Sequence, residues 1–308
     1  MFSSGRFVAK ALMLGVLLGV LLVGGCASKP RLWPAFNGDP DATLAAPLPL
    51  PVAGDRLTFD DGQSETVIKV VEDTVTWRNN RGVVHERSRD PLMPSLRWKS
   101  KYRNAEVTFD QGAPGSMWPL RTDTQARIAY SNFVWDRRTH RSKVYRSEYL
   151  CQVRGTMTQT SPAGRFQGYQ IDCRKFSRDN RISGYRRFFY SPQSGYVISQ
   201  EDTFSSDRPA KIKQLIGIEL SLQDLAPDVR QDLAKARNKA LSTLPSGQSL
   251  GFSAADKYVS ATVTPLRTFK TDKGYYCREY QEARTVGPRT GRFTAIACNL
   301  PKRGWVRR

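Results

Sequence analysis

Residues 52–206 show the period-two alternation of apolar and polar positions that is typical of β-strands. Short runs rich in Val, Thr and aromatic residues are separated by turn clusters such as Ser161-Pro162-Ala163-Gly164. Nine runs fit the pattern: 66–71, 74–78, 83–89, 106–110, 126–136, 143–158, 165–173, 185–190 and 196–202. Because no helical pattern interrupts these runs, we predict an N-terminal antiparallel β barrel or sandwich over 52–206.

The pattern changes in residues 207–245, which we expect to be a helical linker. From Ala226 onward the apolar residues recur at helical spacing, at Val229, Leu233, Ala236, Ala240, Leu241 and Leu244. Pro227 suits the first turn of a helix, and Asp228 suits the positive end of the helix dipole. Pro245 then ends the helix.

Residues 246–308 return to a strand pattern, which predicts a small C-terminal β-rich domain. The alternation is clearest over 262–264, 275–281, 293–299 and 305–307. The chain as a whole is therefore expected to be mainly β, with a connecting α-helix between its two β domains.

The first 25 residues have the features of a secretion signal peptide. Arg6 and Lys10 precede an uncharged apolar run of 13 residues, Ala11–Val23, whereas a membrane-spanning helix needs about 20. The run ends in Val23-Gly24-Gly25-Cys26, which resembles the bacterial lipobox. That resemblance implies cleavage before Cys26 and attachment of lipid to its thiol. The alternative is an ordinary signal peptide that is cut near Ala27-Ser28.

Lipidation of Cys26 would fix the location of the protein. Each buried methylene of a lipid contributes about 0.8 kcal/mol, so an anchor of two or three chains is effectively permanent. In the enterobacterial sorting rule, an Asp directly after the lipidated cysteine retains a lipoprotein at the inner membrane. This chain has Ala27 at that position, so by analogy we expect transfer to the outer membrane. Residues 26–51 contain six Pro and are expected to be a Pro-rich tether. The side of the membrane that the body faces stays open.

Composition argues against several classes of protein. Hydrophobic residues make up 39% of the chain and aromatic residues 10%, which excludes wholesale disorder. His85 and His140 are the only histidines, and no motif of a serine hydrolase, a zinc protease or a phosphate-binding loop is visible. We therefore expect no enzymatic activity, no metal and no cofactor.

The four remaining cysteines, Cys151, Cys173, Cys277 and Cys298, form an even number in an exported protein. Three pairings are open. We favour Cys151–Cys173 with Cys277–Cys298, because this local pairing places one disulfide in each β domain and closes loops of 22 and 21 residues. A zinc site is the rival interpretation, but the chain has no CxxC motif and no His near these cysteines.

Positive charge is the strongest compositional signal. Lys and Arg number 48 against 28 Asp and Glu, which gives a formal net charge of +20. Arg97, Lys99, Lys101 and Arg103 occupy alternate positions, so a strand over this segment would carry all four cations on one face. Two further basic clusters lie within 137–146 and 174–187.

We interpret the basic segments first as a solvated basic face, with an anion-binding surface as the functional alternative. For the anion-binding surface of an exported lipoprotein, the expected partners are lipopolysaccharide phosphates, anionic lipids or extracellular DNA. No motif indicates specific recognition of nucleic acid, and the sequence names no protein partner.

The end of the chain carries short motifs in a fixed order. They are Pro245-Ser246-Gly247-Gln248, Ala261-Thr262-Val263-Thr264-Pro265, Tyr276-Cys277-Arg278-Glu279-Tyr280, Ala297-Cys298 and Gly304-Trp305. This series resembles the C-terminal domain of the rickettsial surface-antigen family of outer-membrane lipoproteins in alphaproteobacteria. The resemblance covers the segment from about Ala240 to the end. It implies a small β-rich domain with no assigned catalytic activity.

The chain departs from that family in two respects. Many members carry a glycine-zipper segment before this domain, where this chain has a β domain and a helix. Lys302-Arg303 replaces the acidic residue that usually precedes the final Gly-x-Trp. Arg278 and Glu279 are neighbours in a strand and point to opposite faces, so we expect cross-strand ion pairs rather than a bond between them, with ligand binding as the alternative.

Three functions are compatible with these features. The leading hypothesis is a non-enzymatic outer-membrane lipoprotein that acts as an envelope scaffold or surface antigen. The second is a basic module that binds polyanions. The third is an envelope hydrolase, which would require a closed cavity with converging carboxylates.

Overall fold

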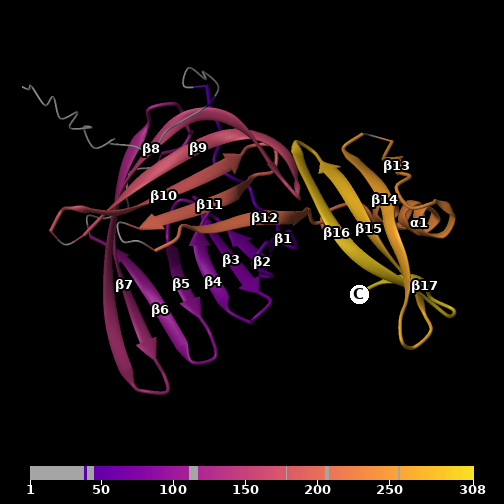
Figure 1. Cartoon of the computed structure of the whole chain (residues 1–308), viewed down its shortest axis with the longest axis horizontal. Coiled ribbons are helices and arrows are strands. Elements are labelled where there is room, and N and C mark those ends of the chain that lie inside the picture. Colours follow the sequence, from indigo (N-terminus) through magenta and orange to yellow (C-terminus); the bar gives the residue numbers. More distant parts are fainter. Residues whose placement is uncertain (1–37, 40–44, 111–116, 178, 205–207, 256) are drawn as a thin grey trace, which may run out of the picture. The chain divides into compact units, whose positions relative to one another are not determined.

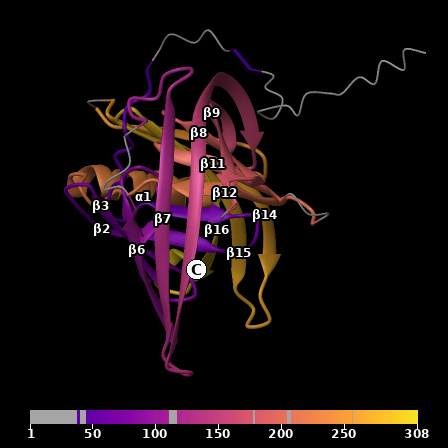
Figure 2. The same ribbon diagram turned by 90° about the vertical axis from the view of Figure 1, so that its left-hand side faces the viewer.

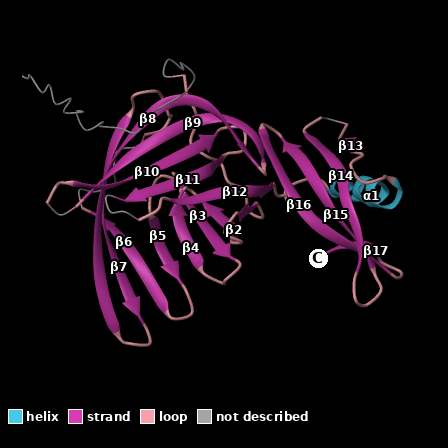
Figure 3. Cartoon of the chain, in the orientation of Figure 1, coloured by secondary structure: helices cyan, strands magenta, loops and turns pink. Residues whose placement is uncertain are grey.

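Figure 1 shows the computed structural model of the chain, which describes residues 38–39, 45–110, 117–177, 179–204, 208–255 and 257–308. The expected signal peptide over 1–25 and the lipidation residue Cys26 lie outside the described residues. All described residues belong to one compact unit, Ala35–Arg308. Strands dominate this unit, and the described residues contain one helix (Figure 3). The mainly β fold class is thereby confirmed.

Twelve strands of the described residues form a closed antiparallel barrel. The strands are β1 (Arg56–Phe59), β2 (Ser64–Val71), β3 (Thr74–Asn79), β4 (Val84–Ser88), β5 (Ser95–Lys99), β6 (Arg103–Phe109), β7 (Gln125–Asp136), β8 (Arg141–Ser161), β9 (Gly164–Phe176), β10 (Ile182–Ser191), β11 (Tyr196–Phe204) and β12 (Lys211–Glu219). Each strand pairs with its neighbours in sequence, and β1 pairs with β12 to close the ring. Figure 2 shows β7 and β8, two of the long strands, side by side.

Nine of the twelve strands, β2–β4 and β6–β11, coincide with the nine predicted runs. The sequence interpretation missed β12, which lies inside the expected helical linker over 207–245, so the barrel continues past residue 206 to Glu219. The physical reason is that β12 closes the barrel by pairing with β1. Leu215 and Ile218 of β12 are fully buried, and their backbone pairs with β1, which would otherwise be an open sheet edge.

The end of the expected tether over 26–51 is part of the folded body rather than a free linker. Ala46 and Leu120 exchange two backbone hydrogen bonds with N···O distances of 3.0 and 2.9 Å. Both residues are almost completely buried. The apolar contact explains why this short stretch docks despite its Pro-rich composition.

Two clusters of buried apolar side chains fill the barrel region. One surrounds the Cys151–Cys173 disulfide and includes Phe188. The other includes Phe189 and also Val286 from the C-terminal part of the chain. Phe188 and Phe189 are consecutive in β10 and enter different clusters because successive side chains of a strand point to opposite faces.

The C-terminal part is a five-stranded antiparallel sheet packed against the helix. Its elements are α1 (Pro227–Thr243), β13 (Leu250–Ser253), β14 (Val259–Lys270), β15 (Tyr276–Val286), β16 (Arg289–Leu300) and β17 (Gly304–Arg307). Ala240 and Leu241 of α1 pack with Val263, Tyr280 and Phe293 of the sheet. The predicted helix and C-terminal β-rich domain are therefore present.

All three buried clusters lie within residues 46–305. A compact unit with its own hydrophobic cores is expected to fold alone, and we refer to residues 35–308 as the body. The helix search over the described residues found none with the length and apolar character needed to cross a bilayer.

Candidate binding sites

The four cations at 97–103 do not lie on one strand, so the prediction of a single cationic strand face is wrong. Arg97 and Lys99 belong to β5, Lys101 lies in a turn, and Arg103 begins β6. Ser100 causes the reversal because its backbone N–H and its hydroxyl both donate to the carbonyl oxygen of Arg103, at 2.8 and 3.0 Å. Such local side-chain bonds favour turns over strands.

The hairpin also separates the cations by face and supplies two of them with acidic partners. Lys99 pairs in register with Asn104, so these two side chains share one face of the hairpin. Arg103 precedes Asn104 in β6 and therefore points to the opposite face from Lys99. Arg97 binds Glu106 at 2.9 Å and Arg103 binds Asp136 at 2.8 Å. Acidic partners therefore balance the charge of these two arginines.

Unpaired positive charge instead gathers around two neighbouring turns. The β5–β6 turn and the β7–β8 turn lie at the same end of the barrel, the lower end in Figure 1, and the backbone N–H of Arg137 donates to the carbonyl of Tyr102 at 2.8 Å. The exposed side chains here, which we call the hairpin surface, are Lys101, Tyr102, Arg137, Arg138, Arg141, Lys143 and Tyr145. No carboxylate of the described residues forms an ion pair with any of these five cations.

Aromatic rings alternate with the cations on the hairpin surface. The Arg138 guanidinium lies 4.7 Å and the Lys101 ammonium 5.0 Å from the centre of the Tyr102 ring. The Lys143 ammonium lies 4.9 Å from the Tyr145 ring. Phe133 and Val144, directly opposite each other in β7 and β8, are also about half exposed, but they point to the opposite face from Lys143 and Tyr145. The apolar area of the hairpin surface therefore comes from the rings of Tyr102 and Tyr145 beside the cations.

The basic cluster within 174–187 is different because carboxylates bind two of its arginines. Arg186 donates two hydrogen bonds to Asp202. Arg187 binds Asp172 at 3.0 Å and approaches Glu201 at 3.6 Å. Arg186 and Arg187 are thus partly buried members of the barrel wall whose charge is balanced, unlike the five cations of the hairpin surface.

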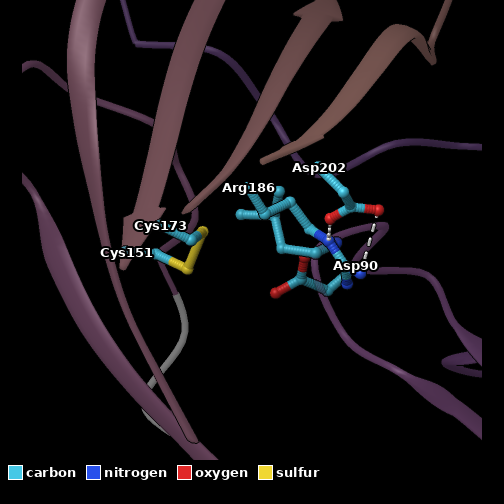
Figure 4. Close-up of a disulfide and its surroundings, with 6 residues drawn as sticks. Asp90, Cys151, Cys173, Arg186 and Asp202 are labelled. Atoms are coloured by element: carbon cyan, nitrogen blue, oxygen red, sulfur yellow. Dashed lines mark hydrogen bonds and ion pairs between the residues drawn. A yellow bond between two sulfur atoms is a disulfide. The ribbon is translucent and has the colours of Figure 1, made fainter. Parts of the chain in front are cut away.

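Figure 4 shows the Arg186–Asp202 pair near the disulfide between Cys151 and Cys173. These cysteines are direct register partners in β8 and β9, and Cys277 and Cys298 are direct partners in β15 and β16. The favoured local pairing is present in both sheets, and each disulfide clamps two adjacent strands.

A cavity of about 270 Å³ lies among strands of the barrel. Its apolar walls include Leu57, Phe59, Val75, Trp77, Met93 and Phe188. Three cationic side chains and one carboxylate also line it: Arg87, Arg89, Lys213 and Glu65. Sequence reasoning missed this cavity, because its residues come from strands that are more than 150 positions apart in the chain.

Glu65 is held by two of these cations. Arg87 donates to both carboxylate oxygens, at 2.8 and 3.0 Å, and to the Ser95 hydroxyl at 3.3 Å. The Lys213 ammonium lies 3.7 Å from the Glu65 carboxylate and 3.7 Å from the centre of the Phe59 ring. The Arg87 guanidinium lies 5.6 Å from the Trp77 ring.

The protonation states of this cluster follow from its surroundings. Burial alone would raise the pKa of Glu65, but Arg87, assisted by Lys213, outweighs burial and lowers it to about 2. Burial and then the charge of Arg87 lower the pKa of His85 to about 4. At neutral pH Glu65 is therefore ionised and His85 is uncharged, so Glu65, Arg87 and Lys213 together carry one net positive charge.

The Tyr-Cys-Arg-Glu-Tyr signature in β15 has structural roles. Arg278 is buried and donates to the carbonyls of Leu241 and Leu244, both at 2.8 Å, where α1 ends. It thus satisfies helix carbonyls that would otherwise lack partners, and the expectation of an ion pair is wrong for this residue. Glu279 does form the expected cross-strand pair, with Arg267.

Within the described residues, no group of three or more His, Cys, Asp or Glu side chains is arranged to hold a metal ion. His85 contacts Ser95 at 3.2 Å, and His140 packs edge-on against Trp135 with ring centres 6.3 Å apart.

Comparison with known proteins confirms the resemblance of the C-terminal region. Residues 239–306, which include the end of α1 and the C-terminal sheet, match the family described as 17 kDa outer membrane surface antigen. The 17 kDa surface antigen of Rickettsia bellii (strain RML369-C) is 36% identical over 67 residues, which are 22% of this chain and 42% of that protein. The 17 kDa surface antigen of Rickettsia prowazekii (strain Madrid E) is 30% identical over 76 residues, which are 25% of this chain and 48% of that protein. The chain thus spans less than half the length of these curated relatives.

Among solved structures, the crystal structure of the hypothetical lipoprotein YmcC from Escherichia coli (K12) covers 54% of this chain and 84% of its own, with 11% identity and a TM-score of 0.37. At that TM-score the likeness carries no conclusion about this protein.

Proposed function

We propose that this chain is a non-catalytic protein of the outer membrane, anchored by lipid on Cys26, whose hairpin surface binds the anionic headgroups of envelope lipids, including lipopolysaccharide phosphates. The family match to outer membrane surface antigens supports the location. The observation that carries the binding function is the group of five exposed cations without carboxylate partners among the described residues.

The aromatic component favours lipid headgroups over a soluble polyanion. Tyrosine rings and long basic side chains place apolar atoms at a membrane boundary and charges among the headgroups. Tyr102 and Tyr145 provide such rings, and they are 41% and 48% exposed, respectively. Each Lys or Arg close to an anionic surface contributes about 1 kcal/mol. The envelope-scaffold role predicted from the sequence stays a prediction.

The body, residues 35–308, can be tested with vesicles of phosphatidylglycerol, vesicles of phosphatidylcholine, and lipopolysaccharide. We expect binding to the two anionic probes that weakens steeply between about 50 and 200 mM salt, because the salt competes for the charges. The critical variant replaces Lys101, Arg138, Arg141 and Lys143 with Gln and should lose at least about tenfold in affinity.

A matched control removes the same charge elsewhere, by replacing Arg230, Lys239, Lys273 and Lys302, all exposed, with Gln. This variant should keep most of its affinity. Equal weakening of the two variants would show that net charge acts without a site. Absence of binding to anionic probes at low salt would refute the proposal outright.

A further inference from the structure

The barrel cavity has a chemistry that the proposed headgroup surface does not use. Its walls join aliphatic and aromatic side chains to a compact charged group at Glu65, Arg87 and Lys213. Binding pockets for small molecules combine mostly apolar walls with a few polar groups that fix orientation, over about 300–1,000 Å³. At about 270 Å³ this cavity is close to the lower end of that range.

The cations of the cavity are unequally engaged, and Lys213 is the one whose donor groups are least used. Arg87 uses both terminal nitrogens on Glu65 and its Nε on Ser95. Arg89 donates to the Pro49 carbonyl at 3.1 Å and approaches Asp73 at 3.6 Å. Lys213 has three N–H groups, and its carboxylate partner is 3.7 Å away. An anion beside Lys213 would balance the remaining positive charge of the cluster.

We propose that the barrel cavity binds one small amphiphile, with an aliphatic body against Phe59, Trp77 and Phe188 and a single anionic group at Lys213. An apolar body suits this part of the cavity, because polar groups buried against Phe59 and Phe188 would lack hydrogen-bond partners. The single negative charge is set by the net charge of the cluster. Closed barrels with side-chain-lined interiors hold ligands of this size in other folds.

Decanoate is a suitable probe, with decanol as the uncharged compound of equal length. Calorimetric titration of the body should show saturable binding of decanoate at one site. Lys213→Met keeps the length of the side chain and removes its charge, and it should weaken decanoate binding about tenfold or more while leaving decanol binding unchanged. Lys213→Arg should restore most of the affinity for decanoate.

Lys211→Met is the matched control, because Lys211 is an exposed residue of the same strand and does not line the cavity. It should bind decanoate as the parent does, and so should the hairpin variant with four Gln replacements, since the two sites are independent. The proposal is overturned if decanoate shows no saturable binding, or if Lys213→Met binds it as tightly as the parent. Melting temperatures of all variants identify any that have unfolded.

Discussion

Arg289, the first residue of β16, donates a hydrogen bond to Asp55, a carboxylate without solvent exposure just before β1. Asp55 also accepts bonds from the Tyr196 hydroxyl and from the backbone N–H of Ser221, the latter at 2.7 Å. One buried carboxylate thus connects the start of the barrel, β11, the chain after β12 and the C-terminal sheet.

Replacing Asp55 with Ala should destabilise the body by about 3–5 kcal/mol, because Arg289 would be left buried without its partner. Chemical unfolding measures this loss. Arg307→Met is the control: Arg307 links β17 to Glu219 of β12, but its side chain is 36% exposed, so its loss should cost no more than about 1 kcal/mol. Equal effects of the two substitutions would contradict the role assigned to Asp55.

Acidification should destabilise the body in two steps. His85 has a folded pKa of about 4, below its ordinary value of 6.5, so the unfolded state takes up a proton first and stability falls as pH drops from 6.5 to 4. Glu65 has a folded pKa of about 2 against 4.5, so its contribution, about 3 kcal/mol, is present above pH 4.5 and is lost between 4.5 and 2.

Melting temperatures measured from pH 7.5 to 4 test the first step. His85→Gln should flatten the dependence in this range, whereas His140→Gln, at an exposed turn residue, should leave it as in the parent. A parent and a His85→Gln variant with the same pH dependence would show that His85 takes no part.

The two disulfides should behave as independent clamps. Cys151→Ser should leave Cys173 as a free thiol and the Cys277–Cys298 bond intact, because each pair joins directly opposed strand residues within its own sheet. Peptide mapping of the unreduced protein identifies the partners, and each loss should cost about 3 kcal/mol. A peptide that joins Cys151 to Cys277 or Cys298 would refute the pairing.

Lipidation at Cys26 should be visible in cells that express the full chain. Radiolabelled palmitate should enter the parent and not Cys26→Ser, and the variant should accumulate as an unprocessed or released form because the lipobox cysteine is absent. Equal labelling of both proteins would exclude Cys26 as the lipidated residue.

Local patterns were sufficient for most of the fold. The helix was predicted from residue 226 and spans Pro227–Thr243, because its apolar spacing, its N-terminal Pro and its terminating Pro all lie within one segment. β1 and β12 were missed because each owes its state to the other: Leu57 pairs with Ile218 across 161 positions of sequence. No window along the chain contains that information.

For the candidate sites, too, local patterns in the sequence could not show contacts that form only in the fold. The alternating cations of 97–103 predicted a strand, but the Ser100–Arg103 hydrogen bonds form a turn instead, and a period-two pattern alone cannot show this. The hairpin surface forms because Tyr102 and Arg137, which belong to separate hairpins, come together in the fold. The aromatic and basic composition was the sequence signal that could have located it.

The pairing of β1 with β12 also sets the order in which the barrel can be completed during synthesis. A chain made from its N-terminus presents β1 long before Glu219 is added, and until then the growing sheet has two open edges. Such edges template association with other chains. We therefore expect a truncation that stops before Lys211 to aggregate, and the demand for chaperones to fall only once the last barrel strand has been made.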